Sequence, residues 1–143
     1  MDKGPIDVRT PLGKRIAERL ETEIMIWLTT VAPDGTPQPN PVWFLWDGST
    51  LLVYSHNKAA RLRNLRQNPR VSLNFDSRDQ GESDVHILTG SARIAPDELP
   101  VTKNELYLAK YAEAIKGIGS ETEKFAKLYS VPLRITPEKA RSF

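Results

Sequence analysis

The spacing of apolar residues changes along the chain and predicts helices in some segments and strands in others. Thr10 and Pro11 supply a capping hydroxyl and a proline suited to the first helical turn. Apolar residues then recur at helical spacing: Leu12, Ile16, Ala17 and Leu20. This segment is expected to be an amphipathic helix that packs on the body of the domain.

Strand character follows between residues 24 and 55. Residues 24–31 are apolar on both alternating faces, which predicts a strand buried on both sides. Residues 36–41 contain prolines that cannot donate ladder hydrogen bonds, so this extended segment belongs at a sheet edge. Residues 42–46 and 51–55 flank a turn at Asp47 and Gly48, and they predict the clearest hairpin in the sequence.

A basic helix is expected over residues 58–67, and it should end before Asn68 and Pro69. Three apolar residues then alternate with polar ones, which predicts a strand with one buried face: Val71, Leu73 and Phe75. Residues 78–83 are charged and contain a glycine, and they are expected to form a loop.

The remaining segments complete a sheet and a helical part. Residues 84–94 predict a strand in which Gly90 marks a bulge or a close backbone approach. Residues 97–129 predict two helices separated at 117–119, and residues 131–135 predict a last strand before Pro137. About six strands in mostly antiparallel hairpins, with helices inserted, indicate a small β-barrel of the α+β class in a single domain, 1–143.

Composition narrows the class of protein. The 143 residues carry a formal net charge of only +2, which argues against a nucleic-acid binder that relies on overall charge. Cysteine is absent, so the sequence contains no disulfide framework, no thiolate metal site and no cysteine nucleophile. The apolar runs are much shorter than a membrane span, and no hydrophobic leader region is recognised. A cytoplasmic protein without a membrane partner is expected.

The most informative local pattern is the basic turn and helix that follow residue 55. Lys58 and Arg61 would lie in the first helical turn, where the helix dipole disfavours cations. A phosphate would remove this conflict, because cations and free backbone N–H groups would converge on it. Ser55 and Asn57 add polar groups at the helix entrance, although either could simply be the N-cap. For Arg63 and Arg66 we prefer the alternative to phosphate binding, in which they belong to a solvated basic face of the helix.

Aromatic residues crowd the strands on either side of the proline-rich segment. Phe44 and Trp46 are expected to be core residues. A planar aromatic ligand lying on the sheet would instead contact the backbone of Val42 and Trp43, close to two polar side chains, Gln38 and Asn40. The sequence therefore places the candidate site for a planar aromatic ligand next to the candidate site for a phosphate.

The sequence contains few signs of metal binding or of side-chain catalysis. His56 and His86 stand alone, without acidic partners at metal-ligand spacing, so no metal site is expected. His86 is expected to have an ordinary hydrogen-bond partner on a strand face, and His56 is a weak candidate for phosphate contact. Hydrolase elbows, phosphate-binding glycine loops and paired carboxylates are not found in the sequence. No catalytic side chain can be named.

Four segments follow one another in order along the chain: Pro-Val-Trp-Phe-Leu-Trp-Asp-Gly at 41–48, Leu-Val-Tyr-Ser at 52–55, Arg-Leu-Arg-Asn-Leu at 61–65 and Asn-Pro-Arg-Val-Ser-Leu at 68–73. Together they resemble the flavin- and deazaflavin-binding split-barrel superfamily related to pyridoxamine 5′-phosphate oxidase. Within that superfamily the chain is most similar to the short oxidoreductases assigned to coenzyme F-420. The resemblance runs from about residue 12 to residue 94 and includes the last strand.

The resemblance implies a six-stranded antiparallel split β-barrel with flanking helices, and a homodimer with cofactor sites at the subunit interface. The cofactor would be F-420 or FMN. Its phosphate would meet Ser55, Asn57, Lys58 and Arg61, and its ring would lie along the strand from Gln38 to Trp43. The family usually has lysine at the position of Arg61, but a guanidinium can also clamp a phosphate.

The implied function is an oxidoreductase that moves a hydride between the cofactor and a small organic substrate, with the cofactor carrying the chemistry. A non-catalytic carrier or sensor of the same cofactor is the alternative, since the sequence around residues 55–65 would look the same. A third interpretation, a small barrel that binds single-stranded nucleic acid, is disfavoured by the low net charge.

Overall fold

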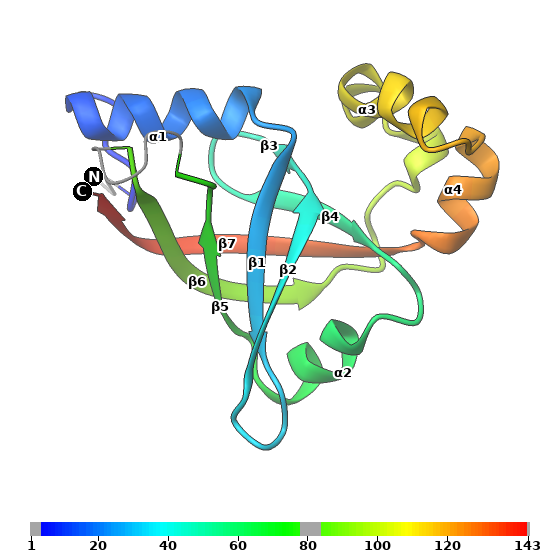
Figure 1. Ribbon diagram of the computed structural model, residues 1–143, viewed down its shortest axis with the longest axis horizontal. Coiled ribbons are helices and arrows are strands. Elements are labelled where there is room, and N and C mark those ends of the chain that lie inside the picture. Colours follow the sequence, from blue (N-terminus) through cyan, green and yellow to red (C-terminus); the bar gives the residue numbers. More distant parts are fainter. Residues whose placement is uncertain (1–3, 78–83, 143) are drawn as a thin grey trace.

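The computed structural model describes residues 4–77 and 84–142, which form one curled antiparallel sheet with helices around it (Figure 1). The sheet has seven strands in the order β2-β1-β5-β6-β7-β4-β3. The strands are β1 (Met25–Val31), β2 (Pro37–Trp43), β3 (Leu45–Trp46), β4 (Leu51–Ser55), β5 (Arg70–Asn74), β6 (His86–Ile94) and β7 (Val131–Ser142). The predicted α+β fold with an antiparallel sheet is confirmed.

The helices lie on three sides of the sheet (Figure 1). They are α1 (Pro11–Thr22), α2 (Ala60–Gln67), the short 3₁₀ helix η1 (Val101–Lys103), α3 (Glu105–Gly117) and α4 (Thr122–Leu128). The N-terminal helix packs on the core through Ile16 and Leu20, and the two helices expected within 97–129 are present. None of the helices in the described residues is long and apolar enough to cross a membrane.

The sheet has a seventh strand because the segment 42–46 is not one continuous strand. The backbone breaks at Phe44, where the chain leaves its pairing with β1 and begins to pair with β4. The hydroxyl of Tyr111 on α3 accepts from the Phe44 amide at 2.8 Å and lies 2.9 Å from the Phe44 carbonyl oxygen. A helix side chain therefore satisfies the backbone groups that a neighbouring strand would otherwise bind.

Strand β1 is buried on one face only, so the prediction of burial on both sides is wrong. Ile26 and Leu28 face the core, but Met25 is 46% exposed and Trp27 is partly exposed. The sheet is antiparallel around β1, and only one of its faces carries the core at this point. The apolar residues on the second face of β1 therefore mark a face that the rest of the chain covers only partly.

The last strand continues well beyond residue 135, so the predicted end before Pro137 is wrong. A register shift at Thr89 and Gly90 sets Pro137 opposite Gly90. This irregularity lets the strand pass through a proline, because a bulge interrupts the ladder at that point. The predicted close approach at Gly90 is confirmed, since a Cβ there would come within 2.0 Å of the Thr136 carbonyl oxygen.

Strand β4 separates two apolar clusters and is buried on both faces. Leu51 and Val53 belong to the main core inside the curled sheet. Leu52 and Tyr54 point the other way, into a second cluster formed mostly with α3 and α4. This second cluster holds the two helices against the outer face of β4 and creates the wall of the candidate site.

Helix α2 begins two residues later than predicted. Its N-cap is Ala59, which has no side-chain capping bond, and Lys58 lies in the turn before the helix. Neither Ser55 nor Asn57 is the N-cap. The loop predicted at 78–83 lies outside the described residues.

Candidate functional site

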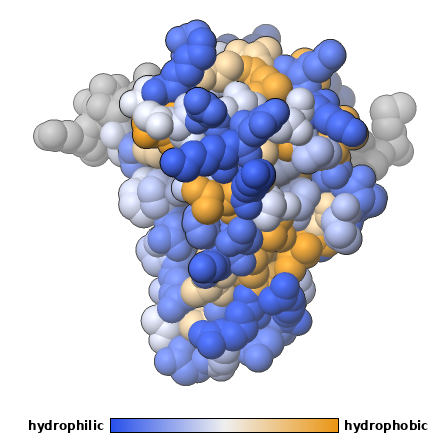
Figure 2. All heavy atoms as spheres, turned by 90° about the vertical axis from the view of Figure 1, so that its right-hand side faces the viewer, coloured by the Kyte–Doolittle hydropathy of each residue, from blue (hydrophilic) through white to orange (hydrophobic). Residues whose placement is uncertain are grey.

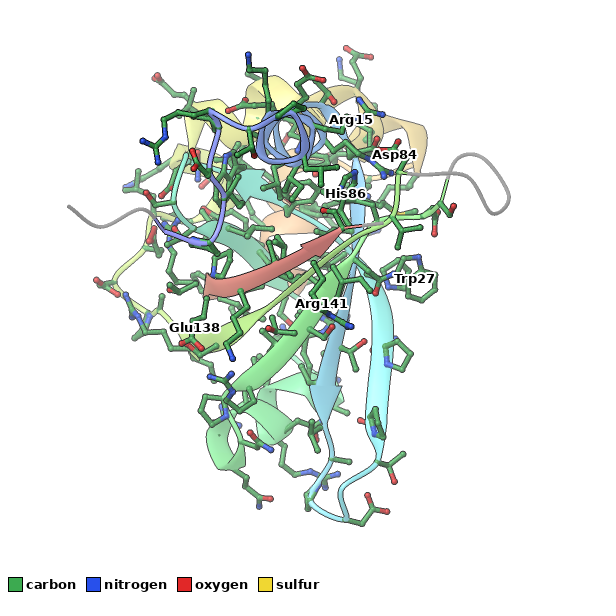
Figure 3. The ribbon with its side chains drawn as sticks, turned by 90° about the vertical axis from the view of Figure 1, so that its left-hand side faces the viewer. Arg15, Trp27, Asp84, His86, Glu138 and Arg141 are labelled. Atoms are coloured by element: carbon green, nitrogen blue, oxygen red, sulfur yellow. The ribbon has the colours of Figure 1, made fainter. Side chains whose placement is uncertain are left out.

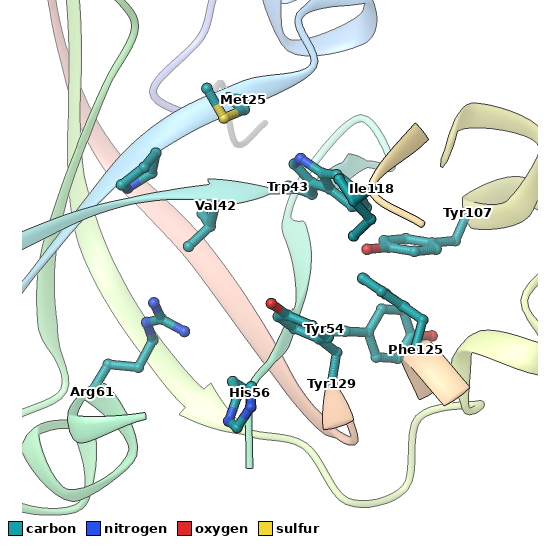
Figure 4. A pocket seen from close by; sticks show the side chains of 11 residues that line it. Met25, Val42, Trp43, Tyr54, His56, Arg61, Tyr107, Ile118, Phe125 and Tyr129 are labelled. Carbon is teal, nitrogen blue, oxygen red and sulfur yellow. The ribbon is translucent and has the colours of Figure 1, made fainter. Parts of the chain in front are cut away.

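A pocket of about 340 Å³ lies where β2, the end of β4, helix α2 and helices α3 and α4 meet (Figure 4). Its walls are mostly aromatic and apolar, and Arg61 supplies a positive charge at one side. Seen from this side, apolar side chains gather between the helical part at the top and the polar lower end of the molecule (Figure 2). The lining residues that carry aromatic rings or polar side chains are Trp43, Tyr54, His56, Arg61, Tyr107, Phe125 and Tyr129.

A run of stacked rings joins the sheet to the two helices. Trp43 stacks on Tyr111, with ring centroids 4.9 Å apart, and on Phe125 at 5.5 Å. Phe125 in turn stacks on Tyr129 at 4.4 Å, and His56 meets Tyr129 edge-on. Such pairs stabilise an interface by about 0.5–1.5 kcal/mol each beyond the area they bury. The stack therefore holds α4 over the pocket and gives the pocket an aromatic wall.

Arg61 is the charged group of the pocket, and its guanidinium is half-buried. Its Nη1 donates to the Ser55 hydroxyl at 2.9 Å. Within residues 4–77 and 84–142, no carboxylate lies within 4 Å of Arg61. Burial lowers the pKa of Arg61 below its ordinary value. A cation held in this way is better stabilised when an anion binds beside it.

The other residues predicted to bind phosphate take different positions. The Ser55 hydroxyl is buried, accepts from Arg61 and donates to the His56 carbonyl oxygen. Asn57 is tied to the end of α4, since its side-chain amide donates to Lys127 O at 3.1 Å. Lys58 is exposed and does not line the pocket. The structure brings Ser55 and Arg61 together and leaves Asn57 and Lys58 at the margin.

The residues predicted to meet a ring divide in the same way. Val42 and Trp43 line the pocket. Gln38 and Asn40 lie further along β2, on exposed positions outside the pocket. Gln38 is held by Asn64 of α2, whose Nδ2 donates to the Gln38 Oε1 at 2.8 Å.

Sequence reasoning missed the aromatic residues that close the pocket. Tyr107 and Tyr111 on α3, and Phe125 and Tyr129 at α4, are pairs four residues apart on one helix face. Tyr54 points toward them because alternate residues of a strand face opposite sides. The i, i+4 aromatic spacing is the pattern that would have placed these rings on the same wall.

The two histidines have separate environments. His86 is buried far from the pocket, with ring nitrogens 2.8 Å from Ser142 Oγ and from Asp84 Oδ1, so its predicted ordinary hydrogen bonding is confirmed (Figure 3). His56 lines the pocket, and its Nδ1 accepts from the Lys58 amide at 3.1 Å. Among the described residues, no group of three or more acidic, histidine or cysteine side chains could hold a metal ion.

The pocket suits a ligand with a planar ring and an anionic group. The half-buried guanidinium lacks a carboxylate partner in the described part of the chain, and it would accept the anion together with the Ser55 hydroxyl. The stacked rings of Trp43 and Phe125 provide an aromatic wall for the ring. A flavin or deazaflavin phosphate has both parts, so the residues present fit such a cofactor.

Comparison with known proteins identifies the family and the fold. A pyridoxine/pyridoxamine 5′-phosphate oxidase of Bacteroides thetaiotaomicron is 33% identical over 89 residues, which take in 61% of this chain and only 41% of that relative. A solved structure described as an F420 reductase shares 27% identity and a TM-score of 0.63, covering 87% of this chain and 94% of its own.

A third similar structure is HutZ from Vibrio cholerae, which is described as a heme storage protein. It is 20% identical, with a TM-score of 0.63 over 93% of this chain and 95% of its own, and it shows the fold alone. These likenesses confirm the split-barrel fold expected from the sequence. The family model described as pyridoxamine 5′-phosphate oxidase matches residues 12–142. The chain therefore belongs to the pyridoxamine 5′-phosphate oxidase family.

Proposed function

We propose that this protein is a cytoplasmic oxidoreductase that binds F-420 or FMN and transfers a hydride between that cofactor and a small organic substrate. The observation that carries the proposal is Arg61, a half-buried cation that borders an aromatic pocket without a carboxylate partner in the residues described. Membership of the family and the likeness to a structure described as an F420 reductase support the same class of chemistry.

The chain's own residues would bind and orient the cofactor. Arg61 and Ser55 hold the phosphate, since the 2.9 Å bond between them already aims the guanidinium. Val42 and Trp43 position the ring, and the aromatic side chains of α3 and α4 exclude water from it. The bound deazaflavin or flavin supplies the hydride chemistry. Asn57 and Lys58 contribute as supplementary polar groups at the phosphate end.

The protein is proposed to act as a homodimer with its cofactor sites at the subunit interface. The pocket lies beside the open edge of the sheet, and two large apolar side chains next to it are about half exposed, Ile24 and Met25. A second subunit that covers this region would complete the ring site. Light scattering coupled to size-exclusion chromatography is expected to give twice the mass of 16.1 kDa, and a monomer at micromolar concentration would contradict the dimer.

Titration of the purified protein with FMN, oxidised F-420 and reduced F-420 tests the proposal. The wild-type chain is expected to bind at least one of them with micromolar or tighter affinity. Arg61→Met is expected to weaken binding by about 100-fold through loss of a charge-assisted bond, and the exposed Arg63→Met, on the same helix, by less than about twofold. Failure of the wild-type chain to bind any of the three tighter than millimolar would overturn the assignment.

A carrier or sensor that binds the same cofactor without turnover is the second candidate. It is favoured by one observation, that no carboxylate lines the pocket in the described residues. Stopped-flow mixing of the protein and reduced cofactor with enones, quinones and nitroaromatics separates the two candidates. Oxidation no faster than that of the free cofactor across the panel would favour the carrier.

A further inference from the structure

Three tyrosine side chains pack on one another where β4 meets helix α3. The Tyr107 ring lies edge-on to the ring of Tyr54 and is tilted against that of Tyr111, and in both pairs the ring centroids are 4.8 Å apart. Tyr107 is 1% exposed, so its ring is held from two sides in a close-packed cluster. The direction of its hydroxyl is therefore set by the packing.

The hydroxyl groups of the three tyrosines differ in what they bind. The Tyr54 hydroxyl donates to the Leu99 carbonyl oxygen at 2.6 Å. The Tyr111 hydroxyl binds the backbone at the break at Phe44. No hydrogen bond of the Tyr107 hydroxyl is found in residues 4–77 and 84–142, where only its backbone amide has a partner side chain. Two of the hydroxyls thus satisfy backbone groups of the fold, and the third is left for another partner.

The Tyr107 hydroxyl opens into the candidate site. Tyr107 lines the pocket, and Figure 4 shows its hydroxyl pointing away from α3 into the space beside Trp43 and Phe125. Among the described residues, Asn64 Oδ1 is the one fully buried side-chain oxygen or nitrogen without a partner, so the Tyr107 hydroxyl keeps contact with the open space of the pocket. A polar group left open on an otherwise buried side chain is available to a ligand.

The surroundings of this hydroxyl are apolar. Trp43, Ile118 and Phe125 line its side of the pocket, and Arg61 supplies the charge on the opposite side (Figure 4). Burial raises the pKa of Tyr107 above its ordinary value, so the group stays an O–H donor at neutral pH. A neutral donor in an apolar wall suits an uncharged oxygen acceptor such as a carbonyl group.

The position of Tyr107 favours contact with a substrate over contact with the cofactor. In the proposed function the phosphate meets Arg61 and the ring lies along Val42 and Trp43 of β2, whereas Tyr107 comes from α3. A hydride acceptor has to lie on the ring face that the strand leaves free, which is the side of the helices. Burial lowers the pKa of Arg61 and the Tyr129 phenol partly offsets this, so Tyr129 belongs to the phosphate end.

We propose that Tyr107 donates a hydrogen bond to the carbonyl oxygen of the substrate, and that the substrate is a conjugated carbonyl compound, an enone or a quinone. This inference rests on the proposed function and names the substrate class of the same site. The β-carbon of an enone takes up the hydride as the cofactor is oxidised, and the conjugated electron pairs shift to give an enolate oxygen. Tyr107 stabilises that oxygen, and water then supplies the proton to the α-carbon.

Kinetics of Tyr107→Phe with two kinds of acceptor test the inference. The variant is expected to lower kcat/KM for cyclohexenone and for menadione by about 100-fold, because the donor to the developing oxyanion is lost. N-methylacridinium is a planar hydride acceptor without oxygen, so its kcat/KM should change by less than about twofold. The ratio between the carbonyl acceptors and N-methylacridinium is therefore the readout.

Tyr111→Phe is the matched control on the same helix. The Tyr111 hydroxyl binds the backbone, and Tyr111 does not line the pocket, so this variant should unfold more easily and keep the acceptor ratio within about twofold of the wild type. Tyr107→Phe should show the reverse, with an unchanged melting temperature and a lost ratio. Its dissociation constants for FMN and F-420 should stay within about twofold of the wild type.

The infrared spectrum of bound fluorenone tests the hydrogen bond directly. Fluorenone is a planar ketone, and the oxidised cofactor in the complex has no hydride to give it. Its C=O stretch is expected at a lower frequency in the wild-type complex than in the Tyr107→Phe complex, because a donated hydrogen bond weakens the C=O bond. If Tyr107→Phe folds poorly, the wild-type spectrum alone decides. A stretch at the frequency seen in an apolar solvent would overturn the inference.

The outcomes separate this inference from the proposed function. A wild-type chain that turns over enones while Tyr107→Phe does so within about twofold of it overturns the inference alone. A Tyr107→Phe variant that loses cofactor affinity and keeps the acceptor ratio assigns the hydroxyl to the cofactor and overturns the substrate contact. A wild-type chain that binds neither cofactor, or transfers no hydride to any acceptor, overturns the proposed function and this inference with it.

Discussion

The hydroxyl oxygen of Tyr111 lies 2.8 Å from the amide nitrogen of Phe44 and 2.7 Å from the carbonyl oxygen of Ile24. One phenol on α3 therefore joins the start of β1 to the break between β2 and β3. The helix is fixed to the sheet at the position where Trp43 turns toward the pocket. This phenol anchors α3 to the sheet beside the candidate site, together with Lys110, whose amine donates to the Phe44 carbonyl oxygen at 2.8 Å.

Tyr111→Phe is expected to lower the free energy of unfolding by about 1–3 kcal/mol, because the buried Phe44 amide loses its partner. Urea unfolding followed by fluorescence measures the change. Tyr107→Phe is the control, since no hydrogen bond to the Tyr107 hydroxyl is found in the described residues and its loss should cost under about 0.5 kcal/mol. Equal losses in both variants would contradict the anchor.

Trp43→Leu is expected to loosen α4, because the ring stacked between Tyr111 and Phe125 is removed. Trypsin should then cleave faster in α4, at Lys124 and Lys127. Mass spectrometry of the early fragments measures the rate at each site. Trp27→Leu, a change of the same size on the partly exposed face of β1, should leave these rates near the wild-type values.

Gly90→Ala is expected to be severely destabilising, since its Cβ would lie 2.0 Å from the Thr136 carbonyl oxygen and 2.9 Å from Pro137 Cα. A loss of about 3 kcal/mol or more in unfolding free energy follows from overpacking against backbone. Gly117→Ala at the end of α3 meets nothing within 4 Å and should be neutral or slightly stabilising. Thermal melts of the two variants side by side provide the comparison.

Asp84→Asn is expected to cost about 3 kcal/mol at pH 7 because Asp84 is the carboxylate partner of Arg15 and of the buried Arg19 (Figure 3). The hydrogen bond from Arg15 holds the pKa of Asp84 well below its ordinary value. A lowered folded-state pKa gives stability that is present above the unfolded value of 3.8 and is lost as the pH falls through the folded value. Denaturant unfolding at several pH values should therefore show the wild type and the variant converging below about pH 4.

Lys110 gives a second pH dependence of the same sign, at alkaline pH. Burial beside the Phe44 carbonyl lowers the pKa of Lys110 to about 8 from 10.5. The unfolded chain then binds more protons than the folded chain between these values, so stability rises with pH in this range. Relative to Lys110→Met, the wild type should gain on the order of 2 kcal/mol between about pH 7.5 and 9.5.

A second lysine of α3 serves as the control for the pH-dependent difference in stability between the wild type and Lys110→Met. Lys116→Met, an exposed change on the same helix, should show a flat difference across this range. Burial raises the pKa of Tyr107 and Tyr111 above 10, so these groups begin to lower stability only at higher pH. A flat difference for Lys110→Met would show that this amine is more solvated than its contacts indicate.

The sequence predicted the elements whose cause is local. Thr10 and Pro11 start α1, Gly90 marks the bulge, and Asp47 turns the chain between β3 and β4 by accepting from Ser49 and Thr50. The break at Phe44 could not be predicted, because it is made by a hydroxyl 67 residues away. The length of β7 depends likewise on its pairing with β6.

The candidate site was predicted on its strand side and missed on its helix side. Val42, Trp43 and Arg61 line the pocket, since a strand and an adjacent helix fix them within 20 residues of chain. Tyr107, Phe125 and Tyr129 come to the same pocket only because Leu52 and Tyr54 give β4 a second apolar face. Whether the predicted residues bind a cofactor stays a prediction until the titrations are made.

The proline-rich edge of β2 limits how this protein can associate. Residues 37, 39 and 41 are prolines at alternate positions, and β2 pairs with β1 along its whole length, so the missing N–H groups fall on the side away from β1. The outer edge therefore offers carbonyl oxygens without donors and cannot template another strand. A second chain that meets this edge has to bind through side chains and cannot extend the sheet, which protects an open half-barrel from growing into a fibre.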